Sequence, residues 1–243
     1  MDEQITSVED YLKRIKSYKK FRSDRNTTGE SWLFRGQAMD SALKPKILRL
    51  TSKIDLLDAE RQMFAEFKRA NPLLVDPYRA IDERDYLTLG QYFGLPTRLL
   101  DWSDNALTAL WFATSLEIQH ENQRNSAAVI WMLTTTEADF INIDTYGKPF
   151  DADQTFFYRP RIIKQRINNQ SGVFSVHGND ALRRGISLLD MERYASRLVK
   201  LTIPHDHIDQ IRSELNILGV HAFSIFPELE GLCDYLQWKF FDA

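Results

Sequence analysis

The sequence predicts a single α+β domain. Segments with apolar residues at helical spacing are interspersed, in irregular order, with short apolar or alternating runs that are typical of strands. Hydrophobic residues make up 43% and charged residues 27% of the 243 positions, ordinary values for a globular protein with a substantial core. No repeat, low-complexity segment or long linker divides the sequence. One domain is therefore the simplest organisation.

Charge and cysteine content narrow the classes of function. The 31 Lys and Arg against 34 Asp and Glu give a net charge of −3, so only the local segments 13–25 and 159–166 are basic enough to indicate nucleic acid. The single cysteine, Cys233, excludes an internal disulfide and is expected in the core. The polar, acidic N-terminus and the lack of an 18-residue apolar run predict a cytoplasmic protein without membrane contact.

The first half of the chain is expected to contain three helices and one strand. Ser7 is the expected N-cap of the first helix, with Asp10 in the third position as in a capping box. Helical spacing of apolar residues predicts the other two helices over 55–70 and 82–93. The short aromatic run 31–37 predicts a strand that ends near a functional edge.

The middle stretch, 91–113, is the expected centre of the functional site. Arg98, Asp101 and Ser103 interrupt an apolar run that leads into a helix capped from 104–105. Polar groups at such a junction between elements are typical of a ligand site on a rigid scaffold. The structural alternative is that Arg98 and Asp101 simply pair with each other in the core.

The second half alternates between strands and helices. Apolar or alternating runs predict strands over 127–133, 171–178, 196–203 and 220–226. Proline starts and helical spacing predict helices over 204–218 and from 227 onward.

The histidines do not predict a metal site. His205 and His207 flank Asp206 at a helix start, but no third ligand has a matching spacing. His177, next to Gly178 at a strand end, is either a base or ligand contact or, as the favoured interpretation, a surface histidine.

Glu228 and Glu230 form a pair of carboxylates between Pro227 and Gly231. In an extended segment, side chains two residues apart point the same way, so the two carboxylates would share one site. The alternative is that both carboxylates favour the positive end of the following helix.

Four motifs resemble those of the FRG domain family. They are Phe34-Arg35-Gly36, the run 91–103 with 109–113 behind it, the looser 166–174 and the closing 226–232. The resemblance covers residue 31 to the C-terminus, so 1–30 is expected to be an N-terminal helix and loop extension and 31–243 the FRG domain. Tyr92 stands where members often carry histidine, which argues against an obligatory catalytic histidine there.

The order of these motifs is similar to the Arg, Ser, Glu arrangement of ADP-ribosyltransferases. This resemblance implies a split, mostly antiparallel β core flanked by helices, with NAD as co-substrate and no metal. It implies that Glu230 holds the ribose 2′-hydroxyl and steadies an oxocarbenium-like cation, while Glu228 orients or deprotonates the acceptor. The register leaves the two roles exchangeable between them.

The same resemblance implies a set of NAD-binding residues. Ser103 would position the glutamate, Arg35 would bind the phosphates or ribose, and the backbone of Gly36 would face the nicotinamide amide. The residues expected around NAD are Arg35, Gly36, Gln37, Arg98, Asp101, Trp102 and Ser103.

The implied function is an ADP-ribosyltransferase that acts as a bacterial toxin or antiphage effector. Its acceptor would be RNA or protein, and an antitoxin or chaperone would be its partner. Four basic residues close to an aromatic run (Phe156, Phe157 and Tyr158) favour RNA; they are Arg159, Arg161, Lys164 and Arg166. An NAD glycohydrolase with water as acceptor and a non-catalytic binding module are the open alternatives.

Overall fold

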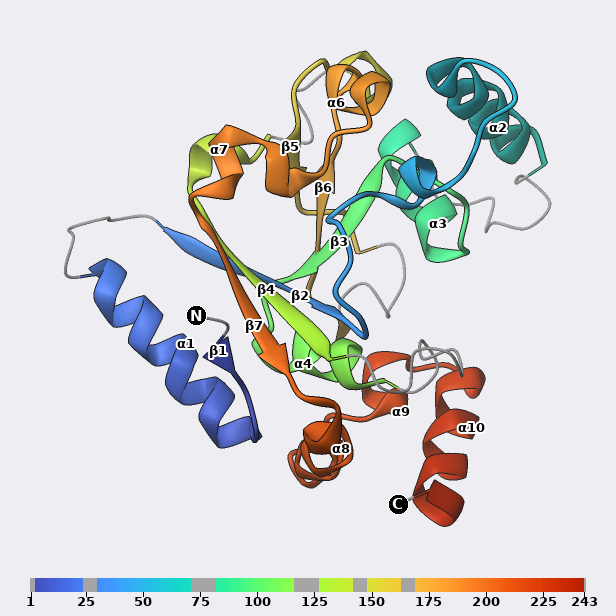
Figure 1. Cartoon of the computed structure of the whole chain (residues 1–243). Helices are drawn as coiled ribbons and strands as arrows, with labels where there is room; N and C mark the ends of the chain where they lie inside the picture. The colour runs from blue at the N-terminus through green and yellow to red at the C-terminus, as the bar shows by residue number, and fades with distance from the viewer. Residues whose placement is uncertain are drawn as a thin grey trace.

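The protein is built on a seven-stranded sheet (Figure 1). The computed structural model describes residues 3–23, 30–70, 82–115, 127–141, 148–162 and 169–242. The strands are β1 (Glu3–Gln4), β2 (Ser31–Gln37), β3 (Leu99–Ser103), β4 (Ala128–Thr135), β5 (Phe156–Tyr158), β6 (Gly172–Val176) and β7 (Leu198–Ile203). Their order is β1-β7-β4-β2-β3-β6-β5, antiparallel except for the pair β1 and β7. The expected α+β class is confirmed.

The sheet divides between β2 and β3. β2 pairs with β4 along its whole length, but with β3 only at Phe34 and Ser103. β3 pairs instead with β6 over all five of its residues. Two neighbouring strands that share one residue pair must separate on the side beyond it, and the site described below lies in that gap.

The helices begin mostly where the sequence places capping side chains. They are α1 (Val8–Ser23), α2 (Leu56–Ala70), α3 (Glu83–Tyr92), α4 (Ala106–Thr114), α6 (Asn179–Arg184), α7 (Glu192–Ala195), α8 (Ile208–Ile217), α9 (Ala222–Ile225) and α10 (Leu229–Gln237), the last continued by a π-helical turn at Trp238–Asp242. The Ser7 hydroxyl accepts from the Asp10 N–H at 3.1 Å, and the Asn105 side chain accepts from the Leu107 N–H at 3.0 Å. The helices predicted over 55–70 and 82–93 are confirmed as α2 and α3.

Helices cover the sheet on both sides. One core cluster joins α1, α4 and α8 to inward residues of β2, β4 and β7, such as Phe34, Ile130 and Leu201. A second cluster packs the opposite face, where Leu33 and Trp131 meet the segment around α7. The alternation of Leu33 and Phe34 between the two clusters is the period of two that a strand buried on both faces requires.

The N-terminal segment is part of this sheet. β1 pairs with β7 through Glu3 and Gln4, and α1 lies alongside that edge (Figure 1). Tyr11 of α1 is buried and donates its hydroxyl to the Ala106 carbonyl of α4 at 3.1 Å. Residues 3–23 therefore share the core with the segment that was expected to form the domain by itself.

Gly36 allows α4 to pack closely under β2. A Cβ at this position would lie 1.9 Å from the Ala109 carbonyl oxygen, so any larger residue would push α4 away from the strand. The Arg-Gly pair at the end of β2 thus has a packing reason, and it fixes the floor of the gap between β2 and β3.

The strand predicted over 220–226 is wrong. The segment contains the short helix α9, capped by a reciprocal pair in which the His221 ring accepts from the Ser224 N–H at 3.3 Å and Ser224 Oγ accepts from the His221 N–H at 2.9 Å. Phe226 then packs against Trp111 and Phe112 of α4 at ring distances of 5.5 and 6.0 Å. The apolar residues that suggested a strand over 220–226 lie in a helical turn instead.

Within the described residues, no helix has both the length and the apolar character needed to cross a membrane.

Candidate functional site

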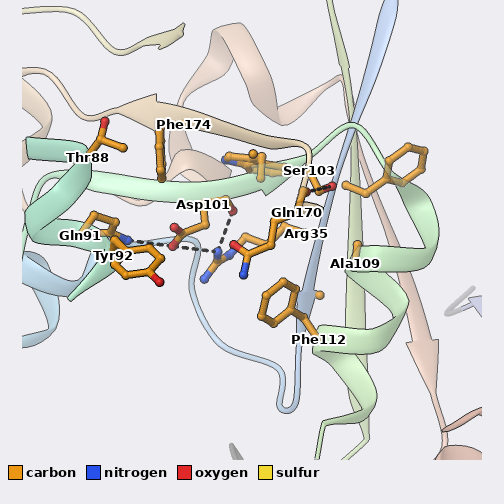
Figure 2. A pocket seen from close by; sticks show the side chains of 14 residues that line it. Arg35, Thr88, Gln91, Tyr92, Asp101, Ser103, Ala109, Phe112, Gln170 and Phe174 are labelled. Atoms are coloured by element: carbon orange, nitrogen blue, oxygen red, sulfur yellow. Dashed lines mark hydrogen bonds and ion pairs between the residues drawn. The ribbon is translucent and has the colours of Figure 1, made fainter. Parts of the chain in front are cut away.

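A cavity of about 290 Å³ opens where β2 and β3 separate. Residues of β2, α3, β3, α4 and β6 line it, together with Gln170 from the turn before β6. Figure 2 shows Arg35 at its centre, with Tyr92 and Phe112 on either side and Asp101 above. Of the residues expected around NAD, the cavity brings together Arg35, Gly36, Asp101, Trp102 and Ser103.

Arg35 is the main positive charge in this cavity. Its Nη1 donates to the Asp101 backbone carbonyl at 2.7 Å and lies 3.8 Å from the Asp101 carboxylate. Burial lowers the pKa of Arg35, although the Asp101 charge opposes the shift, and the nearby Arg49 charge adds to it. Its Nε is buried and has no hydrogen-bond partner among the described residues. A desolvated guanidinium with an unused donor is suited to an acceptor atom of a ligand.

Asp101 is held in place by a short chain of hydrogen bonds. Gln91 Nε2 donates to the Asp101 carboxylate at 2.8 Å, and the Thr97 hydroxyl donates to Gln91 Oε1 at 2.5 Å. The second bond fixes which end of the Gln91 amide faces Asp101. Because its side chain is 56% exposed, Asp101 remains available to a ligand.

Ser103 lines the cavity, but its hydroxyl is already used. It donates to the Gln170 carbonyl at 2.7 Å and accepts from the Asn105 N–H at 3.0 Å. Ser103 thereby joins the end of β3 to the turn before β6 and to the start of α4. In this arrangement it orients Gln170 rather than a glutamate.

The two C-terminal glutamates differ in their relation to the cavity. Glu228 accepts a hydrogen bond from the hydroxyl of Tyr92, which lines the cavity. Glu230 lies in the first turn of α10, is exposed, and does not line the cavity. The expectation that Glu230 faces the same site as Arg35 is therefore wrong, because the segment is a helix start and not a strand end. Glu228 is the carboxylate that reaches the rim.

Arg98 does not pair with Asp101. It is 1% exposed and forms hydrogen bonds to both carboxylate oxygens of the equally buried Glu60, through Nε at 3.0 and 3.1 Å and through Nη2 at 2.5 Å. Nη1 donates to the Pro149 carbonyl and the Asn179 side chain at 3.1 Å each. Arg98 is therefore a core residue, and its expected place beside NAD is wrong.

The other two residues expected around NAD differ in their relation to the cavity. Gln37 does not line the cavity, since its amide bonds Ser41 at 3.1 Å and the Trp131 indole at 2.9 Å. Trp102 contributes to the cavity wall, but its ring is buried in the second core cluster and donates to Ser175 at 3.2 Å. Alternation along β3 explains this, because Asp101 and Ser103 share the face opposite to Trp102.

Several cavity residues were not predicted. Thr88, Gln91 and Tyr92 come from one side of α3, at helical spacing. Gly172 and Phe174 come from alternate positions of β6, and Gln170 comes from the turn before it. The periodicity of 88–92 and of 172–174 was the available signal for the helix and strand residues, but Gln170 lies outside the strand and has no such signal.

The basic segment considered for RNA is largely paired with acidic residues. Arg159 contacts Asp104 at 2.9 Å, and Arg161 contacts Asp82 at 2.7 Å and Asp85 at 3.0 Å. Lys164 and Arg166 lie outside the described residues. Among the described residues, no group of three or more His, Cys, Asp or Glu side chains is arranged to hold a metal ion.

His177 is a core residue and not a surface histidine. It has no exposed area, and burial together with the nearby Arg98 charge lowers its pKa to about 3. It is therefore uncharged in the folded protein at physiological pH, whereas in the unfolded chain it takes up a proton near pH 6.5.

This difference predicts acid sensitivity. Since the unfolded state binds the extra proton, the free energy of unfolding should fall by about 1.4 kcal/mol between pH 7.5 and 5.5 on account of His177. Urea unfolding of the wild type and of His177→Leu at both pH values gives, for each protein, the change in the free energy of unfolding with pH. The difference between these two changes is the contribution of His177. An equal pH dependence of the free energy of unfolding in the two proteins would show that His177 does not remain neutral in the folded state.

Comparison with known families gives one match. The model of the FRG domain matches residues 30–123, a range that begins one residue before the expected start and contains β2, α3, β3 and α4. No curated protein and no solved structure matched the chain. The matched range supplies Arg35, Tyr92, Asp101 and Ser103 of the cavity. Over residues 30–123, this chain is therefore similar to the FRG domain.

Proposed function

We propose that this chain is an NAD-dependent ADP-ribosyltransferase whose reacting centre is the cavity between β2 and β3. The observation that carries the proposal is the convergence there of Arg35, Asp101 and Ser103 with Glu228, which reaches the rim through Tyr92. These groups come from an early strand, the middle of the chain and its C-terminal part, as in the Arg, Ser, Glu order that the motifs resemble.

The residues of the cavity fit a dinucleotide bound through one of its halves. A volume of about 290 Å³ lies at the lower end of ligand sites, so one nucleoside would enter and the rest would lie along the rim. The buried, unpartnered Nε of Arg35 favours a ligand with acceptor oxygens, and the rings of Phe112 and Phe174 favour a flat ring.

In this mechanism the bond between ribose C1′ and the nicotinamide nitrogen breaks, and nicotinamide leaves with the bonding electrons. The positive charge that develops on the ribose would be stabilised by the negative charge of the Glu228 carboxylate, which is exposed at the rim beside Tyr92. A new bond forms between C1′ and the acceptor atom, whose proton passes to Glu228. Tyr92, by donating to Glu228, would fix the orientation of the carboxylate.

The acceptor proposed for this reaction is a macromolecule, RNA or protein. Such a chain would act as a toxin or antiphage effector, held in check by an antitoxin or chaperone. Since Arg159 and Arg161 are paired with carboxylates, RNA has no stronger support than protein.

Incubation of the purified chain with NAD labelled on its adenylate phosphate tests the proposal. We expect the label to appear on a macromolecule when RNA or cell lysate is present, and nuclease or protease sensitivity then identifies the acceptor class. Release of free ADP-ribose alone would replace the transferase with a glycohydrolase. Unreacted NAD in every mixture would refute catalysis.

A further inference from the structure

Gln170 presents an unused amide to the cavity. Its side chain lines the cavity beside Arg35, and Figure 2 shows it between Arg35 and Ser103. Its Nε2 is buried and has no hydrogen-bond partner among the described residues, as is also true of Arg35 Nε. A buried N–H without a partner costs about 1–3 kcal/mol, so two of them in one cavity indicate that a ligand supplies the missing acceptors.

The turn that carries Gln170 is fixed by three hydrogen bonds. Ser103 Oγ donates to the Gln170 carbonyl at 2.7 Å, and the Asp104 N–H donates to the Ser171 carbonyl at 3.2 Å. Asn169 Nδ2 donates to the Ser224 carbonyl of α9 at 3.0 Å. These bonds hold the turn against the end of β3 on one side and against α9 on the other.

The turn also contains local strain. Ser171 has a φ of 46°, the only positive φ of a non-glycine residue in the described chain. A residue of this type in the left-handed region costs on the order of 1 kcal/mol, and such strain persists where the surroundings impose it, often at ligand sites. The strain and the three hydrogen bonds therefore preorganise the Gln170 side chain toward the cavity.

The chemistry of the side chain identifies the group that it would recognise. A primary amide offers N–H donors on one side and a carbonyl acceptor on the other, so another primary amide is its closest complement. Phe112 from α4 and Phe174 from β6 also line the cavity, and their rings suit a flat aromatic ring attached to that amide.

We propose that Gln170 is a specificity-determining residue that reads the carboxamide of the nicotinamide ring, Nε2 donating to its carbonyl and Oε1 accepting from its N–H. This inference rests on the proposed use of NAD and goes beyond it, because it states which atoms distinguish NAD from related dinucleotides. A carboxylate at the same ring position has no N–H to donate, and it would meet Gln170 Oε1 with a second acceptor.

The matched pair of ligands for a test is NAD and nicotinic acid adenine dinucleotide, which differ only in that amide. Dissociation constants are measured by titration calorimetry in a Glu228→Gln background, so that neither ligand is consumed. We expect NAD to bind at least about 10-fold more tightly than the acid when Gln170 is present. Gln170→Met, of similar length but without polar atoms, should bring the two constants within about twofold of each other.

Gln91→Met is the control, because Gln91 lines the same cavity but its amide is engaged with Asp101 and Thr97. It should weaken both ligands to a similar extent and preserve their ratio. Unfolding midpoints of all variants confirm that the fold is retained. The role of Gln170 would be overturned if Gln170→Met left the ratio of the two dissociation constants unchanged. It would also be overturned if the protein with Gln170 present bound the acid more tightly than NAD, through Arg35. Neither result would contradict the use of NAD. Binding of neither dinucleotide would overturn both proposals.

Discussion

Glu228→Gln is expected to lower the rate of ADP-ribose transfer or release by at least about 100-fold. Glutamine has nearly the shape of glutamate and can still accept from Tyr92, so the fold and the rim should be preserved. It lacks the negative charge that would stabilise the ribosyl cation and it cannot take the acceptor's proton. The measurement is the initial rate with saturating labelled NAD, together with the dissociation constant for NAD, which should change little.

Glu230→Gln is the matched control for this prediction. Glu230 is two residues away on the same helix start, and both side chains are exposed and outside the cavity lining, but only Glu228 is bonded to the cavity residue Tyr92. The replacement of Glu230 should leave the rate within about twofold of the wild-type rate, because surface substitutions away from a site have small effects. Tyr92→Phe should fall between the two variants, since it keeps the carboxylate but removes the group that orients it. A large loss in Glu230→Gln with none in Glu228→Gln would reverse the assignment.

The second large effect is expected for stability, at the buried pair of Glu60 and Arg98. Both side chains are 1% exposed, so Glu60→Leu would leave the Arg98 guanidinium buried without its counter-ion. Removing one partner of a buried ion pair costs about 3–5 kcal/mol. We therefore expect Glu60→Leu to lower the free energy of unfolding by that amount, measured by urea unfolding.

The chain offers a control on the same helix for this prediction. Glu66 of α2 pairs with Arg69 at 2.7 Å, but its side chain is 67% exposed, so Glu66→Leu should leave the unfolding midpoint nearly unchanged. The double variant Glu60→Leu with Arg98→Met should recover at least half of the loss, because no isolated charge remains in the core. If the double variant were no more stable than Glu60→Leu alone, the cost would come from packing and not from the unpaired charge.

The sequence predicted those parts of the structure that depend on neighbouring residues. Ser7 and Asn105 cap their helices through bonds that span two or three positions, and such signals can be recognised in a sequence. Arg35 and Ser103 were identified because they lie within motifs of the family that matches residues 30–123. Both do line one cavity.

The errors concern properties that depend on long-range packing. Arg98 has a plausible acidic partner three positions away, but the fold provides Glu60, 38 positions away, as its counter-ion. Cys233 was expected in the core and is exposed, because the apolar side of α10 is only partly covered. His177 was expected at the surface and has no exposed area. Neighbouring sequence does not determine which side of an element becomes covered.

Because β2 and β3 share a single residue pair, Arg35 also helps to connect the two strands. Beyond Phe34 and Ser103 the two strands form no ladder, and the carbonyl of Asp101 accepts the Arg35 guanidinium in place of a backbone N–H. Arg35 thus bridges β2 and β3 where the two strands separate, and it is also a candidate ligand contact. A molecule that engages the free edge of this guanidinium would clamp both halves of the sheet at once, so occupancy of the cavity and rigidity of the whole scaffold should rise together.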